Sequence, residues 1–246
     1  MDSLSIVIPA YNEERRLGGT LDQVLAYLDG HPRSFAEVLA VDDGSRDGTA
    51  ALIQSYAARD PRVQLVSNPG NRGKGYAVRH GLTRAAGEWV LFTDADLSSP
   101  MVELAKLREA VERTGASIAI GSRAIDRSLI GVRQPWARET AGRLFNLVMR
   151  LITGLPFHDT QCGFKLFRRD AAQAVSRLQQ IDGFGFDVEL LYIAKKLGFK
   201  SVEIPVRWDD VAGTKVSFAR GMRAFLDPLE VRWYDLAGRY PVNASR

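Results

Sequence analysis

Short apolar runs alternate with segments that suit helices through the first half of the chain, and this pattern constrains the fold most strongly. Strands are expected at residues 5–10, 38–41, 63–67, 89–93 and 117–121. Helices are expected between them at residues 12–28, 47–59, 75–86 and 102–114. Strands joined by helical crossovers lie parallel in one sheet and place helices on both of its faces. The pattern predicts an α/β protein with a mostly parallel central sheet.

The second half is less regular. Expected elements are a helix at 138–152, a strand at 164–168, a helix at 186–197, a strand at 201–208, and one or two helices over 217–236, broken near Pro228. No linker divides the chain. We expect a single domain over residues 1–246, made up of segments at 1–123 and 124–216 and a helical tail at 217–246.

Composition narrows the class of protein. Hydrophobic residues make up 46% of the 246 positions and charged residues 25%, as in soluble globular proteins. The one cysteine, Cys162, excludes an internal disulfide. We expect no signal peptide and no membrane span, and therefore a cytoplasmic protein. The net charge of +4 favours an anionic partner, but no nucleic-acid-binding signature is present.

The most informative motif is Asp94-Ala95-Asp96, which follows the apolar run at 89–93. Ligands of open α/β sheets bind at the carboxyl ends of the strands. Two close carboxylates repel each other unless a cation lies between them, and hard divalent ions prefer such oxygen ligands. A diphosphate bridged to Asp94 and Asp96 by Mg²⁺ or Mn²⁺ fits this position. Taken alone, so short a pattern is also explained by a helix N-cap and a solvated turn.

Three further polar loops follow predicted strands and are expected at the same edge of the sheet. They are Pro9-Ala10-Tyr11-Asn12-Glu13, Asp42-Asp43-Gly44-Ser45 and Asn71-Arg72-Gly73-Lys74-Gly75. Asp43 can accept a hydrogen bond from the edge of a uracil or a guanine. The third loop can bring backbone N–H groups and positive charge to a phosphate. A solvated lysine at the start of a helix is the alternative for Lys74.

Taken together, these motifs make a family resemblance specific. PAYNEE, VDDGSRDGT, NRGKGYAVRHGL and TDADLSSP, in this order, resemble the inverting nucleotide-sugar glycosyltransferases of family 2, which have the Rossmann-like GT-A fold. GSR at 121–123, GRLFN at 142–146, DTQCGFKLF at 159–167 and FDVELLYIAKKLG at 186–198 are similar to the polyprenyl-phosphate glycosyltransferases. DTQCGFK most resembles the dolichyl-phosphate β-glucosyltransferases and their bacterial relatives. The resemblance spans roughly residues 4–216, and it implies a nucleotide-sugar-binding half at 1–123 and an acceptor-side half at 124–216.

The resemblance implies a role for each matching residue. Asp43 would contact the base, and Asp94 and Asp96 the nucleotide and the metal, with Asp96 the firmer metal ligand. Residues expected to line the nucleoside pocket are Pro9, Ala10, Tyr11 and Glu13. Residues expected at the acceptor phosphate are Arg123, Arg143 and, on a loop that closes over the site, Lys215.

One position departs from the pattern of the mannosyl-transferring enzymes. Those enzymes commonly have a glutamine two residues after the second aspartate, where this chain has Ser98. The expected donor is therefore UDP-glucose, with GDP-mannose second, and the third protein ligand of the metal stays open.

The acceptor decides whether a general base is needed. A phosphate monoester is already largely ionised near pH 7, so Arg123 and Arg143 would suffice to bind and aim it. A hydroxyl acceptor would require a carboxylate base, and Asp159 is the candidate. A turn residue capping its own loop is the alternative for Asp159. A catalytically silent nucleotide-sugar-binding subunit is the alternative from another class of function.

Two stretches bear on membrane contact. Residues 136–157 and 217–240 combine aromatic and aliphatic side chains with arginines, as interfacial amphipathic helices do. Their apolar faces could instead cover the core. Because a polyprenyl phosphate must be met at the membrane, we expect peripheral attachment at its cytoplasmic face.

Overall fold

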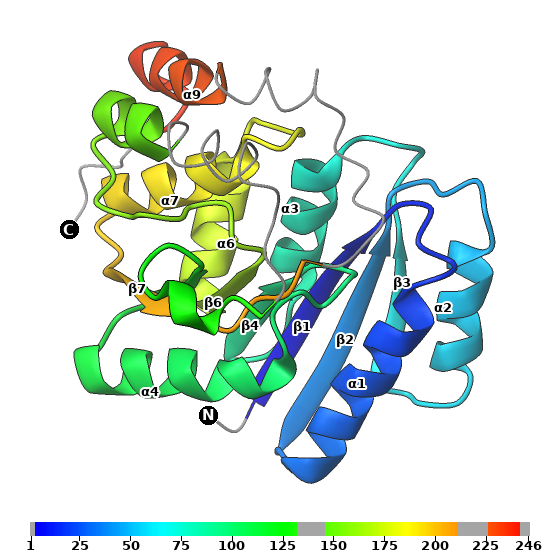
Figure 1. Ribbon diagram of the computed structural model, residues 1–246. Coiled ribbons are helices and arrows are strands. Elements are labelled where there is room, and N and C mark those ends of the chain that lie inside the picture. The colour runs from blue at the N-terminus through cyan, green and yellow to red at the C-terminus, as the bar shows by residue number, and fades with distance from the viewer. Residues whose placement is uncertain (1–2, 132–145, 211–225, 242–246) are drawn as a thin grey trace.

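One seven-stranded sheet forms the centre of the protein, in the strand order β3-β2-β1-β4-β6-β5-β7 (Figure 1). The computed structural model describes residues 3–131, 146–210 and 226–241. The strands are β1 (Ser3–Ala10), β2 (Phe35–Asp42), β3 (Val63–Ser67), β4 (Trp89–Thr93), β5 (Ile118–Ser122), β6 (Phe164–Arg168) and β7 (Ser201–Pro205). Neighbouring strands are parallel, except that β6 runs antiparallel to β4 and to β5. The predicted mostly parallel sheet is confirmed.

Helices cover both faces of this sheet. They are α1 (Leu17–Gly30), α2 (Thr49–Ala57), α3 (Lys74–Arg84), α4 (Leu104–Thr114), α6 (Arg169–Leu178), α7 (Phe186–Lys196) and α9 (Asp227–Leu236), with short 3₁₀ turns η1 (Met101–Glu103) and η2 (Arg127–Leu129). Residues 146–153 are also helical. Across the described ranges, no helix has both the length and the hydropathy to cross a bilayer.

The strands divide the core into two buried clusters. In β1, Val7 packs in one cluster with α3, α6 and α7, whereas Ile6 and Ile8 pack in the other with α1, α2 and α4. Successive side chains of a strand point to opposite faces, so both faces need apolar residues. This explains why the strands read as continuous apolar runs in the sequence.

Some element boundaries differ from those predicted. The first helix begins at Leu17 because Asn12 has a left-handed φ of 55° and the carbonyl of Glu13 accepts from Arg16 N–H and Leu17 N–H in a turn. Helix α6 was not predicted. Pro228 lies in the first turn of α9 and therefore begins a helix instead of breaking one. Residues 138–145 and 217–225 of the predicted helices lie outside the described residues.

The packing of α3 against the sheet gives a test of the fold. A Cβ atom on Gly81 would lie 2.3 Å from Val7 Cγ1, so Gly81→Ala should lower the free energy of unfolding by about 1–3 kcal/mol. Gly19 lies on α1 with no atom within 4 Å of a Cβ, so Gly19→Ala should raise it by about 0.5–1 kcal/mol. Urea denaturation measures both values, and equal effects would contradict this packing.

Candidate active site

Strands β1, β2 and β4 end at one edge of the sheet, and the polar loops that follow them meet there. Asp43 N–H donates to the carbonyl of Ala10 (2.8 Å), and Asn12 N–H donates to Ser45 Oγ (2.9 Å). The first two polar loops of the sequence analysis are therefore joined directly. Their predicted convergence is confirmed.

The Asp94 carboxylate lies where the other two loops come together. Lys74 Nζ, at the start of α3, is 2.6 Å from Asp94 Oδ1. Asp94 N–H donates to the carbonyl of Gly163 (3.1 Å), just before β6. A Cβ atom on Gly163 would lie 2.0 Å from Asp94 Oδ2, so any larger residue would occupy the place of the carboxylate. Glycine in the GFKLF segment thus makes room for the first acid of the pair.

Local hydrogen bonds fix the second acid. Ser98 donates to Asp96 Oδ1 from both its N–H (3.1 Å) and its Oγ (2.9 Å). Between the two acids, the carbonyl of buried Ala95 accepts from Thr20 Oγ1 (2.6 Å). Ser98, the position that departs from the mannosyl pattern, therefore orients Asp96.

The donor set at Asp94 and Asp96 suits one kind of metal site. Among residues 3–131, 146–210 and 226–241, no three His, Cys, Asp or Glu side chains gather as a metal cage. Mg²⁺ commonly uses one or two carboxylates and takes its remaining ligands from substrate phosphates and water. Two carboxylates at the mouth of the sheet fit an ion bound together with a diphosphate.

Four charged side chains from four parts of the fold form what we call the charge cluster: Lys74, Asp94, Lys165 and Asp187. Lys165, on β6, is fully buried, and its ammonium donates to Asp187 on α7 and to the carbonyl of Cys162 (2.7 Å). The Nζ atoms of Lys74 and Lys165 lie 5.6 and 5.5 Å from the centre of the Phe92 ring. The two lysines thus share one aromatic neighbour beneath the site.

Opposite charges in the cluster offset the energetic cost of burying one another. Burial raises the pKa of Asp187, and the nearby Lys165 and Lys74 oppose that rise. Burial lowers the pKa of Lys74, but Asp94 and Asp187 outweigh burial and leave this pKa above its ordinary value. Lys74 is therefore held as a cation beside Asp94. Lys165 was not predicted as a site residue, although a lysine inside the apolar strand FKLF was the signal for it.

Asp43, predicted to contact the base, is buried and holds the loop that leads to Lys74. Its carboxylate accepts from Asn68 Nδ2 (2.8 Å), Arg72 N–H (3.0 Å) and Gly73 N–H (2.8 Å). Gly73 has a φ of 110°, which favours glycine. Contact between Asp43 and a base stays a prediction.

Arg123 and Asp159, the residues predicted to face the acceptor, form a bidentate ion pair. Arg123 Nε donates to Asp159 Oδ2 (2.6 Å) and Arg123 Nη2 to Asp159 Oδ1 (2.8 Å). Burial alone would raise the pKa of Asp159, but the adjacent guanidinium holds it below its ordinary value. A carboxylate held in this way is a weak base, so the geometry favours Asp159 as a residue that positions Arg123. The predicted acceptor residues Arg143 and Lys215 lie outside the described residues.

The residues predicted to line the nucleoside pocket lie at and just beyond the end of β1. Pro9 and Ala10 are buried in the strand, and Tyr11 and Glu13 are partly buried in the loop after it. The Glu13 carboxylate receives hydrogen bonds from Arg16 Nε (2.8 Å) and Nη2 (2.9 Å). These residues border the site edge, and their contact with a nucleoside stays a prediction.

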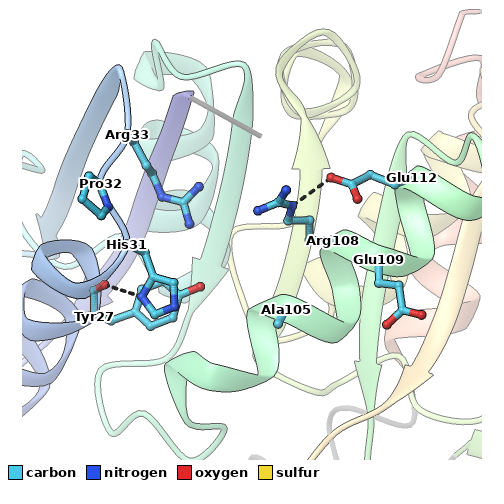
Figure 2. A pocket seen from close by; sticks show the side chains of 8 residues that line it. All are labelled: Tyr27, His31, Pro32, Arg33, Ala105, Arg108, Glu109 and Glu112. Carbon is cyan, nitrogen blue, oxygen red and sulfur yellow. Dashed lines mark hydrogen bonds and ion pairs between the residues drawn. The ribbon is translucent and has the colours of Figure 1, made fainter.

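A separate hollow lies at the other end of the sheet, between the end of α1 and α4 (Figure 2). Its lining residues are Tyr27, His31, Pro32, Arg33, Ala105, Arg108, Glu109 and Glu112. Arg33 immediately precedes the amino end of β2, whereas the Asp94 site is at the carboxyl ends of the strands. This hollow is therefore not part of the candidate active site.

Comparison with known proteins agrees with the geometry. The sequence profile of "Glycosyl transferase family 2" matches residues 5–176. The dolichyl-phosphate beta-glucosyltransferase of Drosophila melanogaster is 37% identical over 226 residues, covering 87% of this chain and 69% of that protein. The enzyme of the same name from Homo sapiens is 34% identical over 256 residues, covering 99% of this chain and 79% of that protein.

Solved structures share the fold. Glucosyl-3-phosphoglycerate synthase from Mycobacterium tuberculosis, in complex with Mn²⁺, uridine diphosphate and phosphoglyceric acid, superposes with a TM-score of 0.68 at 20% identity. The alignment covers 99% of this chain and 80% of that one. The fold is therefore GT-A-like, and by its sequence profile and its relatives this chain belongs to the family 2 glycosyltransferases.

Proposed function

We propose that this enzyme transfers a hexose, with glucose as the first choice, from UDP-glucose to a polyprenyl phosphate with inversion at the sugar. The choice of acceptor rests on the ion pair between Arg123 and Asp159. It leaves a guanidinium at the site edge and makes the one predicted base a poor proton acceptor. Such a site suits an acceptor oxygen that is already ionised.

The charged residues at the donor side favour a nucleoside diphosphate as the donor's leaving group. Asp94 and Asp96 would hold Mg²⁺ or Mn²⁺ together with the diphosphate, and the Lys74 ammonium beside Asp94 would neutralise a phosphate oxygen. A bound metal ion supplies Lewis-acid stabilisation of the charge that develops on the leaving diphosphate. Asp187, which pairs with Lys165, raises the pKa of Lys74 together with Asp94 and so helps to keep its ammonium charged.

The charge of Arg123 favours a phosphate as the acceptor. Burial lowers the pKa of Arg123, but Asp159 and Asp94 lie near enough to raise it above its ordinary value. A phosphate oxygen aimed by Arg123 would form the new bond to the anomeric carbon as the bond to the diphosphate breaks. The electron pair leaves with the nucleoside diphosphate, and no proton has to be removed. A hydroxyl acceptor would need a base, which is why we rank it second.

The choice of glucose rests on the relatives and on Ser98. The relatives described above are named dolichyl-phosphate beta-glucosyltransferases. Ser98 orients Asp96 where the mannosyl pattern has a glutamine. GDP-mannose remains the second donor, and a silent nucleotide-sugar-binding subunit the alternative from another class.

A donor panel tests the proposed reaction. The protein is incubated with UDP-glucose, UDP-galactose or GDP-mannose, with Mn²⁺ or Mg²⁺, and with a short prenyl phosphate or an alkyl glucoside, and products are read by mass. We expect hexosyl phosphoprenol from UDP-glucose. Product from the glucoside hydroxyl, with none from prenyl phosphate, would refute the acceptor, and nucleotide binding without any product would support the silent subunit.

Asp96→Asn should lower turnover by about a hundredfold or more because it removes the firmer metal ligand. Asp170→Asn is the matched control, since this exposed acid pairs with Arg168 at the start of α6 and should leave turnover unchanged. Full activity of Asp96→Asn would remove the metal assignment.

We also propose that the enzyme meets its acceptor through an exposed apolar face at an anionic membrane surface. This face consists of Leu147, Leu151, Leu226, Leu229, Trp233 and Leu236, all exposed. Its two helices, 146–153 and α9, pack through Met149 and Val231 on the same core cluster, and Figure 1 draws both near one end of α7. Arg150, in the helix at 146–153, and Arg239, just after α9, are also exposed and suit anionic lipid.

Flotation with phosphatidylglycerol-containing vesicles tests this surface. Leu229→Glu should lower the fraction of protein bound about tenfold because a carboxylate would enter the lipid interface. Val102→Glu changes an equally exposed apolar residue outside the face (64% exposed against 53% for Leu229) and should bind as the wild type does. Equal loss in both variants, or a wild type that does not float at low salt, would contradict the proposal.

A further inference from the structure

The start of α3, which carries Lys74, is capped by a distant segment of backbone. Within the described part of the chain, no side chain caps this helix. Instead, the N–H groups of Gly75 (2.8 Å) and Tyr76 (3.3 Å) donate to the carbonyl of Asp182. A Cβ atom on Gly75 would lie 2.5 Å from the carbonyl oxygen of Ile181, so the two backbones are in direct contact. The position of the helix start therefore depends on the segment that caps it.

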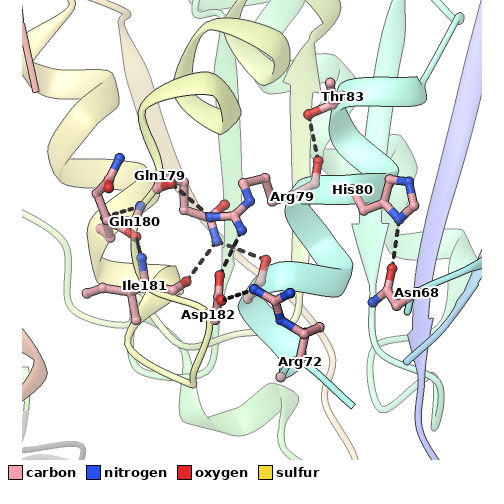
Figure 3. A network of polar contacts seen from close by, with 12 residues as sticks. Asn68, Arg72, Arg79, His80, Thr83, Gln179, Gln180, Ile181 and Asp182 are labelled. Atoms are coloured by element: carbon pink, nitrogen blue, oxygen red, sulfur yellow. Dashed lines mark hydrogen bonds and ion pairs between the residues drawn. The ribbon is translucent and has the colours of Figure 1, made fainter. Parts of the chain in front are cut away.

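We call residues 179–182 the capping loop, and Figure 3 shows how it is tied to α3. Arg79 donates to the Gln179 carbonyl (2.9 Å) and to Asp182 Oδ1 (2.8 Å). In return, Gln179 Nε2 donates to the carbonyl of Gly75 (2.8 Å). The loop and the first turns of α3 thus form one hydrogen-bonded unit.

On its other side, the capping loop is bound to one buried carboxylate. Glu189, on α7, is fully buried and accepts from Gln180 N–H (2.7 Å) and Ile181 N–H (2.9 Å). The hydroxyl of buried Tyr240, just after α9, donates to the same carboxylate (2.7 Å). Burial raises the pKa of Glu189 to about 7, and these three donors oppose the rise. One side chain therefore joins the C-terminal segment to the capping loop.

We propose that Glu189 is a positioning residue through which the C-terminal segment at residues 226–241 sets the geometry of the donor site. Tyr240 orients Glu189, Glu189 holds the capping loop, and the loop fixes the start of α3 and thus Lys74 beside Asp94. The proposal rests on the proposed function only in taking Lys74 to contact a diphosphate. Because α9 also carries the exposed apolar face, contact at that face would reach the donor site by this route.

Two tyrosine variants separate this role from a merely structural one. Tyr240→Phe removes the hydroxyl that reaches Glu189. Tyr192→Phe also removes a hydroxyl that ties α7 to α9, since Tyr192 donates to Asp235 Oδ2 (2.5 Å) and accepts from Arg232 Nη1 (2.6 Å), but it has no bond to the capping loop. The two readouts are UDP affinity by isothermal titration and hydrogen exchange of the peptide that covers residues 74–78.

Tyr240→Phe should weaken UDP binding about fivefold and speed exchange at the start of α3, while Tyr192→Phe should change neither, even though it lowers the melting temperature. Glu189→Gln places an amide donor where the carboxylate accepts two N–H groups. This variant should weaken UDP binding and speed exchange at the start of α3 more than Tyr240→Phe does. Equal exchange in Tyr240→Phe and Tyr192→Phe would overturn the coupling. A wild type that binds no nucleotide would refute the proposed function instead, and exchange alone would then decide the coupling.

Discussion

Burial of charge beneath the site edge is the constraint on which the geometry of the candidate site depends. Lys165 and Asp187 are almost completely removed from water, and an unpaired charge at either position would cost several kcal/mol. Their pairing draws β6 and α7 toward Lys74 and Asp94, so that four parts of the fold supply one charge cluster. A pair of apolar residues would fill this space at less cost. We therefore infer that the pair is kept for the site and not for the fold.

Pairing of a buried charge also positions Arg123, on the side proposed for the acceptor. Arg123 and Asp159 pair at the end of β5, and the Asp159 N–H in turn donates to Glu203 on β7 (2.8 Å). A guanidinium placed in this way is aimed before a substrate arrives, which reduces the entropic cost of binding a phosphate. Lys74 and Arg123 are thus both near enough to feel the charge of Asp94, and we propose that Lys74 serves the donor diphosphate and Arg123 the acceptor.

Periodicity and strand-end motifs were enough to predict the parallel sheet and to place Asp43 and Asp94 at one edge. Those signals are local, because a strand and the loop after it are adjacent in the sequence. The Lys165–Asp187 pair and the Glu189 bridge were not predicted, since each joins elements whose packing is set by the whole fold. The start of α1 was predicted too early. The left-handed backbone of Asn12 delays the helix, and such a conformation leaves no trace in the hydrophobic periodicity of the sequence. The sequence left two roles for Asp159, a general base or a turn residue. Only the structure shows its ion pair with Arg123, which bears on that choice.

The double variant Lys165→Met, Asp187→Leu measures most directly whether the buried pair serves the donor site. Removal of both charges leaves no unpaired ion, so the protein should keep most of its stability to urea. UDP affinity in the presence of Mg²⁺, measured by isothermal titration, should fall about tenfold because Lys74 loses the nearby Asp187 carboxylate, which together with Asp94 keeps it cationic. A folded double variant that binds UDP as tightly as the wild type would contradict the account.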